Sequence, residues 1–210
     1  MPSHPQRGIS EMDKQEPQSC AAFQGDLCIA SGDLLDVARE VKQTLEQKEP
    51  VSVLIFNDFT GEPVEVDFRG TIDEVLRRLP QTPSSPPAPA EPEQEAPRGP
   101  GRPKLGVVSR EVTLLPRHWD WLASQPGGAS VTLRKLVEKA RLANQDRDKA
   151  RQAQEAAYRF MSAMAGNLPG FEEATRALFA GDGPKFERET EEWPGDLRDF
   201  ARKLARPAFR

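Results

Sequence analysis

The sequence predicts an α+β protein with a small β-α-β-β-α unit, a proline-rich linker, a central strand-helix-helix unit and a helical C-terminal subdomain. Three observations carry this prediction. Residues 23–68 switch between strand-like and helix-like hydrophobic periods, residues 80–97 are proline-rich without periodicity, and apolar residues recur at helical spacing beyond residue 116. The expected divisions are a disordered N-terminus at 1–19, an α/β domain at 20–79, the linker at 80–97, a basic central unit at 98–142 and the helical subdomain at 143–210.

The N-terminal elements follow from local composition. Residues 1–19 hold Pro, Ser, Gln and charge without a hydrophobic period, so we expect disorder. A strand is expected at 23–30, an amphipathic helix between Ser31 and Pro50, a strand buried on both faces at 51–56 and, after a hairpin loop, a half-exposed strand at 64–68. Thr71 and Glu74 form a capping-box pattern that begins a short helix.

The central unit begins after the extended spacer formed by the linker. Residues 111–115 are rich in Val, Thr and Leu, which favours a strand. Pro116 ends that strand and begins a helix that places Trp119, Leu122 and Ala123 on one face. After a Pro-Gly-Gly turn, Ser130 is expected to be the N-cap of a second helix.

Helical periodicity continues from the central unit to the C-terminus. One apolar face runs to Gly166, with a polar stretch at 144–149 where the helix could kink. A second helix is expected from Phe171 to Gly181, a short piece from Pro184, and a last amphipathic helix after the break at 193–195.

The order strand, proline, helix, glycine turn, Ser-capped helix resembles that of ribbon-helix-helix repressors. Leu115-Pro116 and Gly128-Ala129-Ser130 match steps of that family. The resemblance implies a homodimer in which two strands pair into a ribbon that enters the DNA major groove. The match departs in two places. The strand presents no face of polar base-readers and contains Glu111, which would repel phosphate, and the spacing from Ser130 to Leu133 and Leu136 differs from the family's pattern. A globular unit whose basic helix face is merely solvated explains the pattern equally well.

The segment before the central unit adds a basic arm. Residues 100–104, Pro-Gly-Arg-Pro-Lys, resemble the Gly-Arg-Pro core of an AT-hook, which implies that Arg102 and Lys104 enter an A·T minor groove. A Pro/Gly linker with ordinary solubilising charge is the alternative.

Charge is distributed unevenly along the chain, whose net charge is −4. Residues 98–151 hold twelve Lys/Arg and five Asp/Glu, a net charge of +7, whereas residues 11–97 hold seven and eighteen, a net charge of −11. Such asymmetry favours an anionic partner for the basic part. It would equally allow the two parts to attract each other.

No motif indicates catalysis. The two histidines and two cysteines lack zinc-ligand spacing, and there is no phosphate-binding loop, dinucleotide turn or nucleophile elbow. His118 and Asp120 lie two apart on a helix and do not face each other. The sequence therefore predicts no enzyme, catalytic residue, metal site, cofactor or small-molecule ligand. It also predicts a cytoplasmic protein without a membrane span, in which Cys20 and Cys28 are reduced thiols; a disulfide is the alternative.

Three stretches are together similar to an uncharacterised bacterial domain-of-unknown-function family that would cover the chain from about residue 23 to its end. They are residues 53–58 with 60–61, residues 101–108 with 111–122, and residues 168–179. This resemblance implies no activity.

The sequence thus predicts a DNA-binding or DNA-associated regulatory protein that acts through the basic central unit as a homodimer. A non-catalytic adaptor that binds another protein is the alternative. The residues expected to contact nucleic acid are Arg102, Lys104, Arg110, Thr113, Ser130, Arg134 and Lys135.

Overall fold

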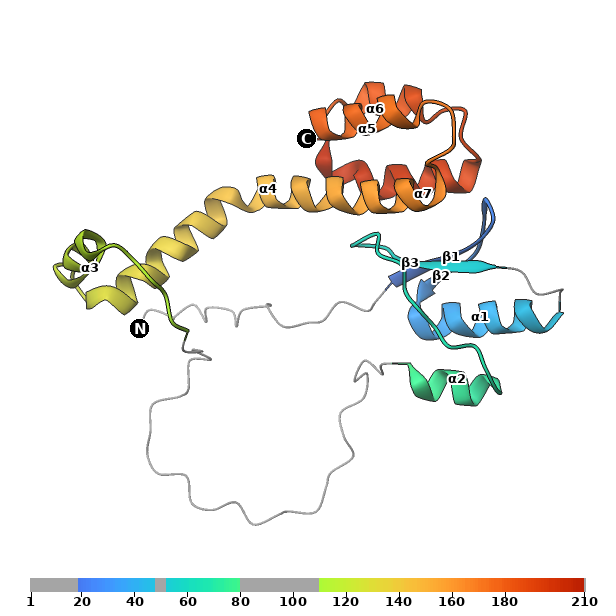
Figure 1. Ribbon diagram of the computed structural model, residues 1–210, viewed down its shortest axis with the longest axis horizontal. Helices are drawn as coiled ribbons and strands as arrows, with labels where there is room; N and C mark the ends of the chain where they lie inside the picture. The colour runs from blue at the N-terminus through green and yellow to red at the C-terminus, as the bar shows by residue number, and fades with distance from the viewer. Residues whose placement is uncertain (1–18, 48–51, 80–109, 210) are drawn as a thin grey trace, which may run out of the picture. The chain divides into compact units, whose positions relative to one another are not determined.

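The computed structural model describes residues 19–47, 52–79 and 110–209 and confirms the α+β class (Figure 1). The elements in chain order are β1 Ser19–Gln24, β2 Leu27–Asp33, α1 Leu34–Gln47, β3 Val53–Asn57, α2 Ile72–Arg78, α3 Pro116–Ala123, α4 Gly128–Met164, α5 Phe171–Ala180, α6 Gly183–Glu189, α7 Gly195–Ala205 and a 3-10 turn Arg206–Ala208. They form two compact units: unit 1 spans residues 1–82 and 147–210, and unit 2 spans 83–146. The expected disordered N-terminus and proline-rich linker lie outside the described residues, apart from Ser19.

The first strand prediction was wrong in one respect, because residues 19–33 form a hairpin and not one strand. β1 and β2 pair antiparallel, with Gln24 opposite Leu27. Gly25 adopts a φ of +59°, which an L-residue with a side chain rarely adopts, and so permits the tight reversal. The apolar residues on both sides of this turn mimic a continuous strand in the sequence. The N-terminal order is therefore β-β-α-β-α instead of β-α-β-β-α.

A strand is confirmed at β3, where Ile55 and Phe56 are buried, but Leu54 is 43% exposed, so the expected burial of the whole strand does not hold. The strand expected after it is absent from the described chain. β3 pairs antiparallel with β1, so the sheet order is β2-β1-β3. Residues 64–68 form no ladder. An isolated bridge joins Phe56 to Pro63 just before them, and Val64 N donates a 2.7 Å hydrogen bond to Ile55 O. Every second side chain, Val64, Val66 and Phe68, is still half-buried against the core. This alternation is why the pattern resembles a strand.

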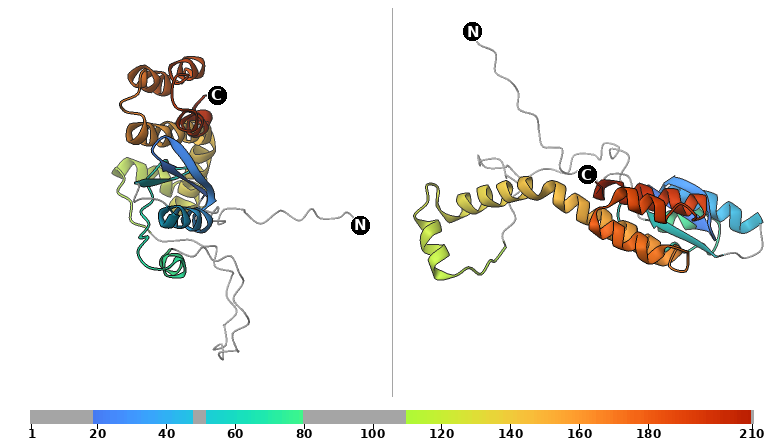
Figure 2. Two further views of the ribbon diagram at one scale, coloured as in Figure 1. Left: turned by 90° about the vertical axis from the view of Figure 1, so that its right-hand side faces the viewer. Right: turned by 90° about the horizontal axis from the view of Figure 1, so that it is seen from above.

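The central strand β1 is covered on both faces. Cys20 and Ala22 point into a cluster with α1, which contributes Val37 and Val41, while Ala21 and Phe23 belong to a second cluster with the C-terminal helices. Figures 1 and 2 show α1 on one side of the sheet and α7 with the C-terminal part of α4 on the other. Successive side chains of a strand alternate between faces, so this short strand joins two cores.

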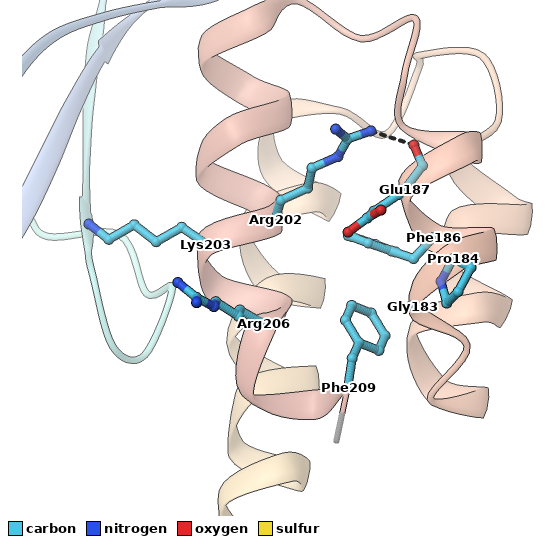
Figure 3. A pocket seen from close by; sticks show the side chains of 8 residues that line it. All are labelled: Gly183, Pro184, Phe186, Glu187, Arg202, Lys203, Arg206 and Phe209. Carbon is cyan, nitrogen blue, oxygen red and sulfur yellow. Dashed lines mark hydrogen bonds between the residues drawn. The ribbon is translucent and has the colours of Figure 1, made fainter.

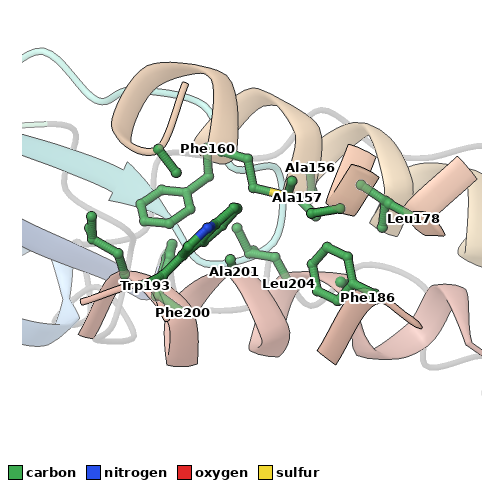
Figure 4. Packing of buried hydrophobic residues seen from close by; sticks show 14 of the residues in the cluster. Ala156, Ala157, Phe160, Leu178, Phe186, Trp193, Phe200, Ala201 and Leu204 are labelled. Carbon is green, nitrogen blue, oxygen red and sulfur yellow. The ribbon is translucent and has the colours of Figure 1, made fainter. Parts of the chain in front are cut away.

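Aromatic rings join the sheet to the helices in the second cluster (Figure 4). The Phe160 ring of α4 is fully buried, and its centroid lies 5.3 Å from that of Phe23, 5.0 Å from that of Phe56 and 4.6 Å from that of Phe200. Each buried ring contributes about 1.5–3 kcal/mol through removal of apolar surface from water. The sequence predicts separate domains at 20–79 and 143–210, whereas residues of both ranges lie in this one cluster.

Polar contacts tie the same parts together. The side chain of Asp58, 7% exposed, accepts hydrogen bonds at Oδ2 from Ser19 Oγ at 2.6 Å and from Lys203 Nζ of α7 at 2.7 Å. A carboxylate this deeply buried requires such partners. The link connects the start of β1, the loop after β3 and the last helix.

The loop at 57–62 lies directly against α4. Asn57 Oδ1 accepts from the backbone N–H of Phe59 and of Thr60, and Arg159 Nη1 donates to Thr60 O at 3.0 Å. Gly61 has a φ of +62°, and a Cβ there would lie 2.1 Å from Ala156 O. Only glycine allows this approach.

The helical predictions for the C-terminal part are confirmed by α5, α6 and α7. Gly181 ends α5, Pro184 lies in the first turn of α6 and the break at 193–195 precedes α7. α4 continues without interruption through residues 144–149 and across the expected boundary at 142/143. No helix in the described ranges is both long and apolar enough to cross a bilayer.

Candidate nucleic-acid interface

Unit 2 begins with the predicted short helix. Pro116 occupies the first turn of α3, where a missing N–H costs nothing, and Leu115 O accepts from His118 N at 2.8 Å. Ser124 Oγ then bonds to Trp121 O at 2.7 Å where the helix ends. The predicted helix at this place is confirmed.

The second helix starts earlier than expected. α4 begins at Gly128, so Ser130 lies inside its first turn and is not the N-cap. The Gly-Gly turn completes the reversal sooner, and the helix begins three residues before Val131, the first helical residue that the capping pattern indicates. Ser130 is exposed, and its carbonyl oxygen accepts a 3.1 Å hydrogen bond from Arg134 Nε.

An apolar groove lies between α3 and α4. It has a volume of about 250 Å³ and is lined by Leu114, His118, Trp121, Leu122, Leu133 and Leu136. Of the predicted inner face of α3, Leu122 does turn inward and is 2% exposed, but Trp119 remains 41% exposed. The residues of α3 that line the groove toward α4 are His118, Trp121 and Leu122. We call the space between α3 and α4 the apolar groove.

Unit 2 leaves much apolar surface uncovered. Among the described residues 110–146, Leu122 is the one buried side chain. Seven large apolar side chains are 41–64% exposed: Val112, Leu115, Trp119, Trp121, Leu136, Val137 and Leu142. Contiguous apolar patches beyond a few hundred Å² mark interaction surfaces.

Basic side chains of α4 point away from the groove or to its side. At 100° per residue, Arg134 and Lys135 lie about 130° from the direction midway between Leu133 and Leu136, and Lys139 lies about 90° from it. All three are exposed, and none forms an ion pair with another described residue. We call these three residues the basic face.

One acidic residue interrupts that face. Glu138 pairs with Arg141 at 2.8 Å. The hydrogen bond from the Arg141 guanidinium lowers the pKa of Glu138 and raises that of the arginine. The two charges neutralise each other, so the pair leaves the net charge of the basic face unchanged.

The other residues predicted to contact nucleic acid lie outside the helices or outside the described residues. Arg110 and Thr113 are exposed in residues 110–115, which have no regular secondary structure in the single chain. A ribbon strand would pair only with a second chain, so the strand at 111–115 stays a prediction. Arg102 and Lys104 lie outside the described residues. The structure thus brings together Ser130 and Arg134, with Lys135 beside them.

Two features were missed from the sequence. Arg117 on α3 is a further exposed cation without an ion-pair partner in the described chain. The groove itself was missed, although the i, i+3, i+4 spacing of His118, Trp121 and Leu122 is the signal that marks its α3 side.

No group of three or more His, Cys, Asp or Glu side chains suited to a metal occurs among the described residues. Cys20 and Cys28 form no disulfide. Burial, followed by the negative charge of nearby Asp58, raises the pKa of the Cys20 thiol to about 11.

Comparison with known proteins identifies one family. The family model described as "Uncharacterized protein conserved in bacteria (DUF2239)" matches residues 19–205. The match covers unit 2 and all of the described part of unit 1 except its last few residues. Neither the curated proteins nor the solved structures contain a significant match to the chain.

Proposed function

The chain belongs to DUF2239, a family of uncharacterized proteins conserved in bacteria, and we propose from the chain's own surface chemistry that it is a DNA-binding regulatory protein. Unit 2 binds the DNA as a homodimer. The observation that carries the proposal is that α4 turns Leu133 and Leu136 into the groove while the basic face stays exposed and without ion pairs among the described residues.

The apolar groove supports the dimer. Half-exposed aromatic side chains such as Trp121 present on the order of 100 Å² each. Trp121 and Leu136 line the groove and are 51% and 44% exposed, so they supply part of the roughly 800 Å² that one partner contributes to a standard interface. A two-fold contact uses the same patch on both copies, so each groove would face its equivalent.

The basic face supports the choice of DNA as ligand. Pairing through the groove would leave Arg134 and Lys135 exposed, because both point away from it, with Lys139 at the edge of the contact. Unpaired exposed cations release counterions when they meet phosphates, which is the main source of sequence-independent DNA affinity. The exposed cations Arg110 and Arg117 add to this charge, while Glu111 opposes it.

A salt series tests the DNA proposal. Fluorescence anisotropy with an A·T-rich duplex of about 30 base pairs, long enough for two half-sites, is measured from about 50 to 200 mM KCl. The double variant Arg134→Ala, Lys135→Ala should bind more weakly. If both side chains contact phosphates, the slope of log K against log[salt] should flatten by about 1.8.

The matched control removes two cations from unit 1. Arg77 makes the same type of side-chain bond to the carbonyl four residues earlier as Arg134 does, and Arg188 is exposed without an ion pair in the described chain. The variant Arg77→Ala, Arg188→Ala should keep both affinity and slope. Equal losses in the two double variants, or no binding at the lowest salt, would refute the proposal.

Sedimentation analysis tests the dimer. Trp121→Glu places a charge in the groove and should yield monomers. Phe179→Glu is the control, because Phe179 of α5 is equally exposed, 51%, but lies in unit 1. A wild-type chain that is monomeric at all concentrations would contradict the dimer.

The apolar groove also favours a second candidate, an adaptor whose unit 2 binds another protein. A groove with almost no polar lining suits an apolar helix as ligand. This candidate predicts a stable partner that copurifies at high salt and after nuclease treatment, and that Trp121→Glu releases. Under the DNA proposal, high salt and nuclease leave only the homodimer.

A further inference from the structure

Unit 1 holds a cavity that the proposed function does not use. It has a volume of about 500 Å³ and lies between α6 and α7 (Figure 3). Its lining residues are Gly183, Pro184, Phe186, Glu187, Arg202, Lys203, Arg206 and Phe209. Sites for small molecules typically measure about 300–1,000 Å³.

One part of the cavity is apolar. The ring of Phe186 is fully buried, and the Phe209 ring lies against it with a centroid distance of 5.3 Å. Pro184 adds a rigid aliphatic surface from the first turn of α6. Gly183 lies so close to Phe209 that a Cβ there would stand 3.2 Å from the Phe209 side chain. These residues form a firm apolar wall.

The other part is cationic and held in position. Arg202 reaches from α7 to α6, as Figure 3 shows, where its Nη2 donates to Glu187 O and to Glu191 Oε2 at 2.9 Å. Its Nε donates to the buried Thr190 Oγ1 at 3.0 Å. These bonds fix the guanidinium and leave Nη1 without a hydrogen-bond partner among the described residues.

Arg206, one helical turn after Arg202, supplies a second guanidinium. It is exposed and has no side-chain partner in the described ranges. Lys203 also lines the cavity but is engaged by Asp58. With Glu187 as the one acidic residue of the lining, the cavity carries three cations against one anion.

We propose that this cavity binds a small organic anion, with a carboxylate or phosphate head held by Arg206, the positive charge of Arg202 added to the cavity, and an aromatic or aliphatic body against Phe186 and Phe209. A guanidinium forms paired, charge-assisted hydrogen bonds with either head group. The preformed wall and the fixed Arg202 keep the loss of side-chain entropy on binding small. No covalent step is involved.

The test uses the full-length protein and four probes. Titrations followed by ¹H–¹⁵N correlation NMR compare 1-naphthylacetate with its neutral amide, and phenyl phosphate with inorganic phosphate. The expected result is saturable binding of 1-naphthylacetate, with shifts concentrated in residues 183–187 and 202–209. The amide should bind at least about tenfold more weakly, since a hydrogen bond to a charged group is worth about that factor. The tighter of 1-naphthylacetate and phenyl phosphate identifies the head group.

Two substitutions locate the contact. Arg206→Gln should weaken the preferred probe about tenfold, and Arg206→Glu should weaken it further. Because Arg206 has no partner to lose, both variants should stay folded, which circular dichroism checks. Arg188→Gln, an exposed cation of α6 outside the cavity, should bind like the wild type.

Four results would overturn the proposal. They are no saturable binding up to about 10 mM probe, equal binding of the amide, unchanged affinity in Arg206→Gln, and inorganic phosphate binding as tightly as phenyl phosphate. The last would show that the apolar wall contributes nothing. None of these outcomes depends on DNA binding by unit 2, so the two proposals succeed or fail separately.

Discussion

Replacing Phe160 by Ala should destabilise the sheet and the C-terminal helices together. The Phe160 ring is fully buried and contacts Phe23 of β1, Phe56 of β3 and Phe200 of α7, with centroid distances of 4.6–5.3 Å. Removing it withdraws one side chain from three elements far apart in the sequence. Truncation of a buried Phe costs about 3–5 kcal/mol. That is a third or more of the stability of a domain with about 10 kcal/mol.

Urea denaturation and native-state hydrogen exchange measure this loss. The free energy of unfolding should fall by about 3–5 kcal/mol. The protection of the Ala22 amide in β1 should fall as much as that of the Leu204 amide in α7. The control Phe179→Ala removes a ring that is 51% exposed and contacts only Tyr158 among the aromatic residues described, so it should cost about 1 kcal/mol. Unchanged protection in β1 beside lost protection in α7 would refute the single core.

Three further predictions concern single side chains. Gly61→Ala should destabilise by at least about 3 kcal/mol in urea, because its Cβ would meet the α4 carbonyl, whereas Gly25→Ala, with a similar φ but open space, should cost only about 1–2 kcal/mol; equal costs would contradict the close approach. Thiol labelling at pH 8 should modify exposed Cys28 before buried Cys20, whose pKa is raised to about 11, and equal rates in the folded protein would be unexpected. The hydrogen bond from the Lys185 ammonium, together with the nearby Arg176 guanidinium, lowers the pKa of Glu173. The stabilising effect of Glu173 is therefore present at neutral pH and lost as the pH falls through that lowered pKa. Glu173→Gln should flatten the acid dependence of the urea midpoint below about pH 4, and an unchanged profile would refute the link.

Sequence patterns predicted most helices well, because their signals are local. The capping box is present, with Thr71 N donating to Glu74 Oε2 at 2.8 Å, and Pro116 begins α3. The strand signals were less reliable. The turn at Gly25 divides one apolar run into the two strands of a hairpin. Residues 64–68 alternate between half-buried and exposed side chains but form no ladder. In both cases the missing information was the pairing partner, which lies elsewhere in the chain.

The candidate interface was predicted only in part. The basic side chains of α4 could be predicted from the sequence, because helical spacing alone gives the angle of each residue relative to Leu133 and Leu136. Ser130 was assigned a capping role that the earlier helix start removes. The groove needed the position of α3 against α4, and the cavity beside Arg202 needed α6 against α7. No local pattern contains either arrangement.

By itself the sequence determined the class of the protein, the helical segments and the uneven charge, because each depends on neighbours within a few residues. Only the tertiary structure decided that β1 is the middle strand, covered on one face by α1 and on the other by helices more than a hundred residues later. A strand buried on both faces has no unique partner in its own pattern. Which apolar segment covers which face depends on how closely side chains such as Phe23 and Phe160 fit together, and that is a property of the folded chain.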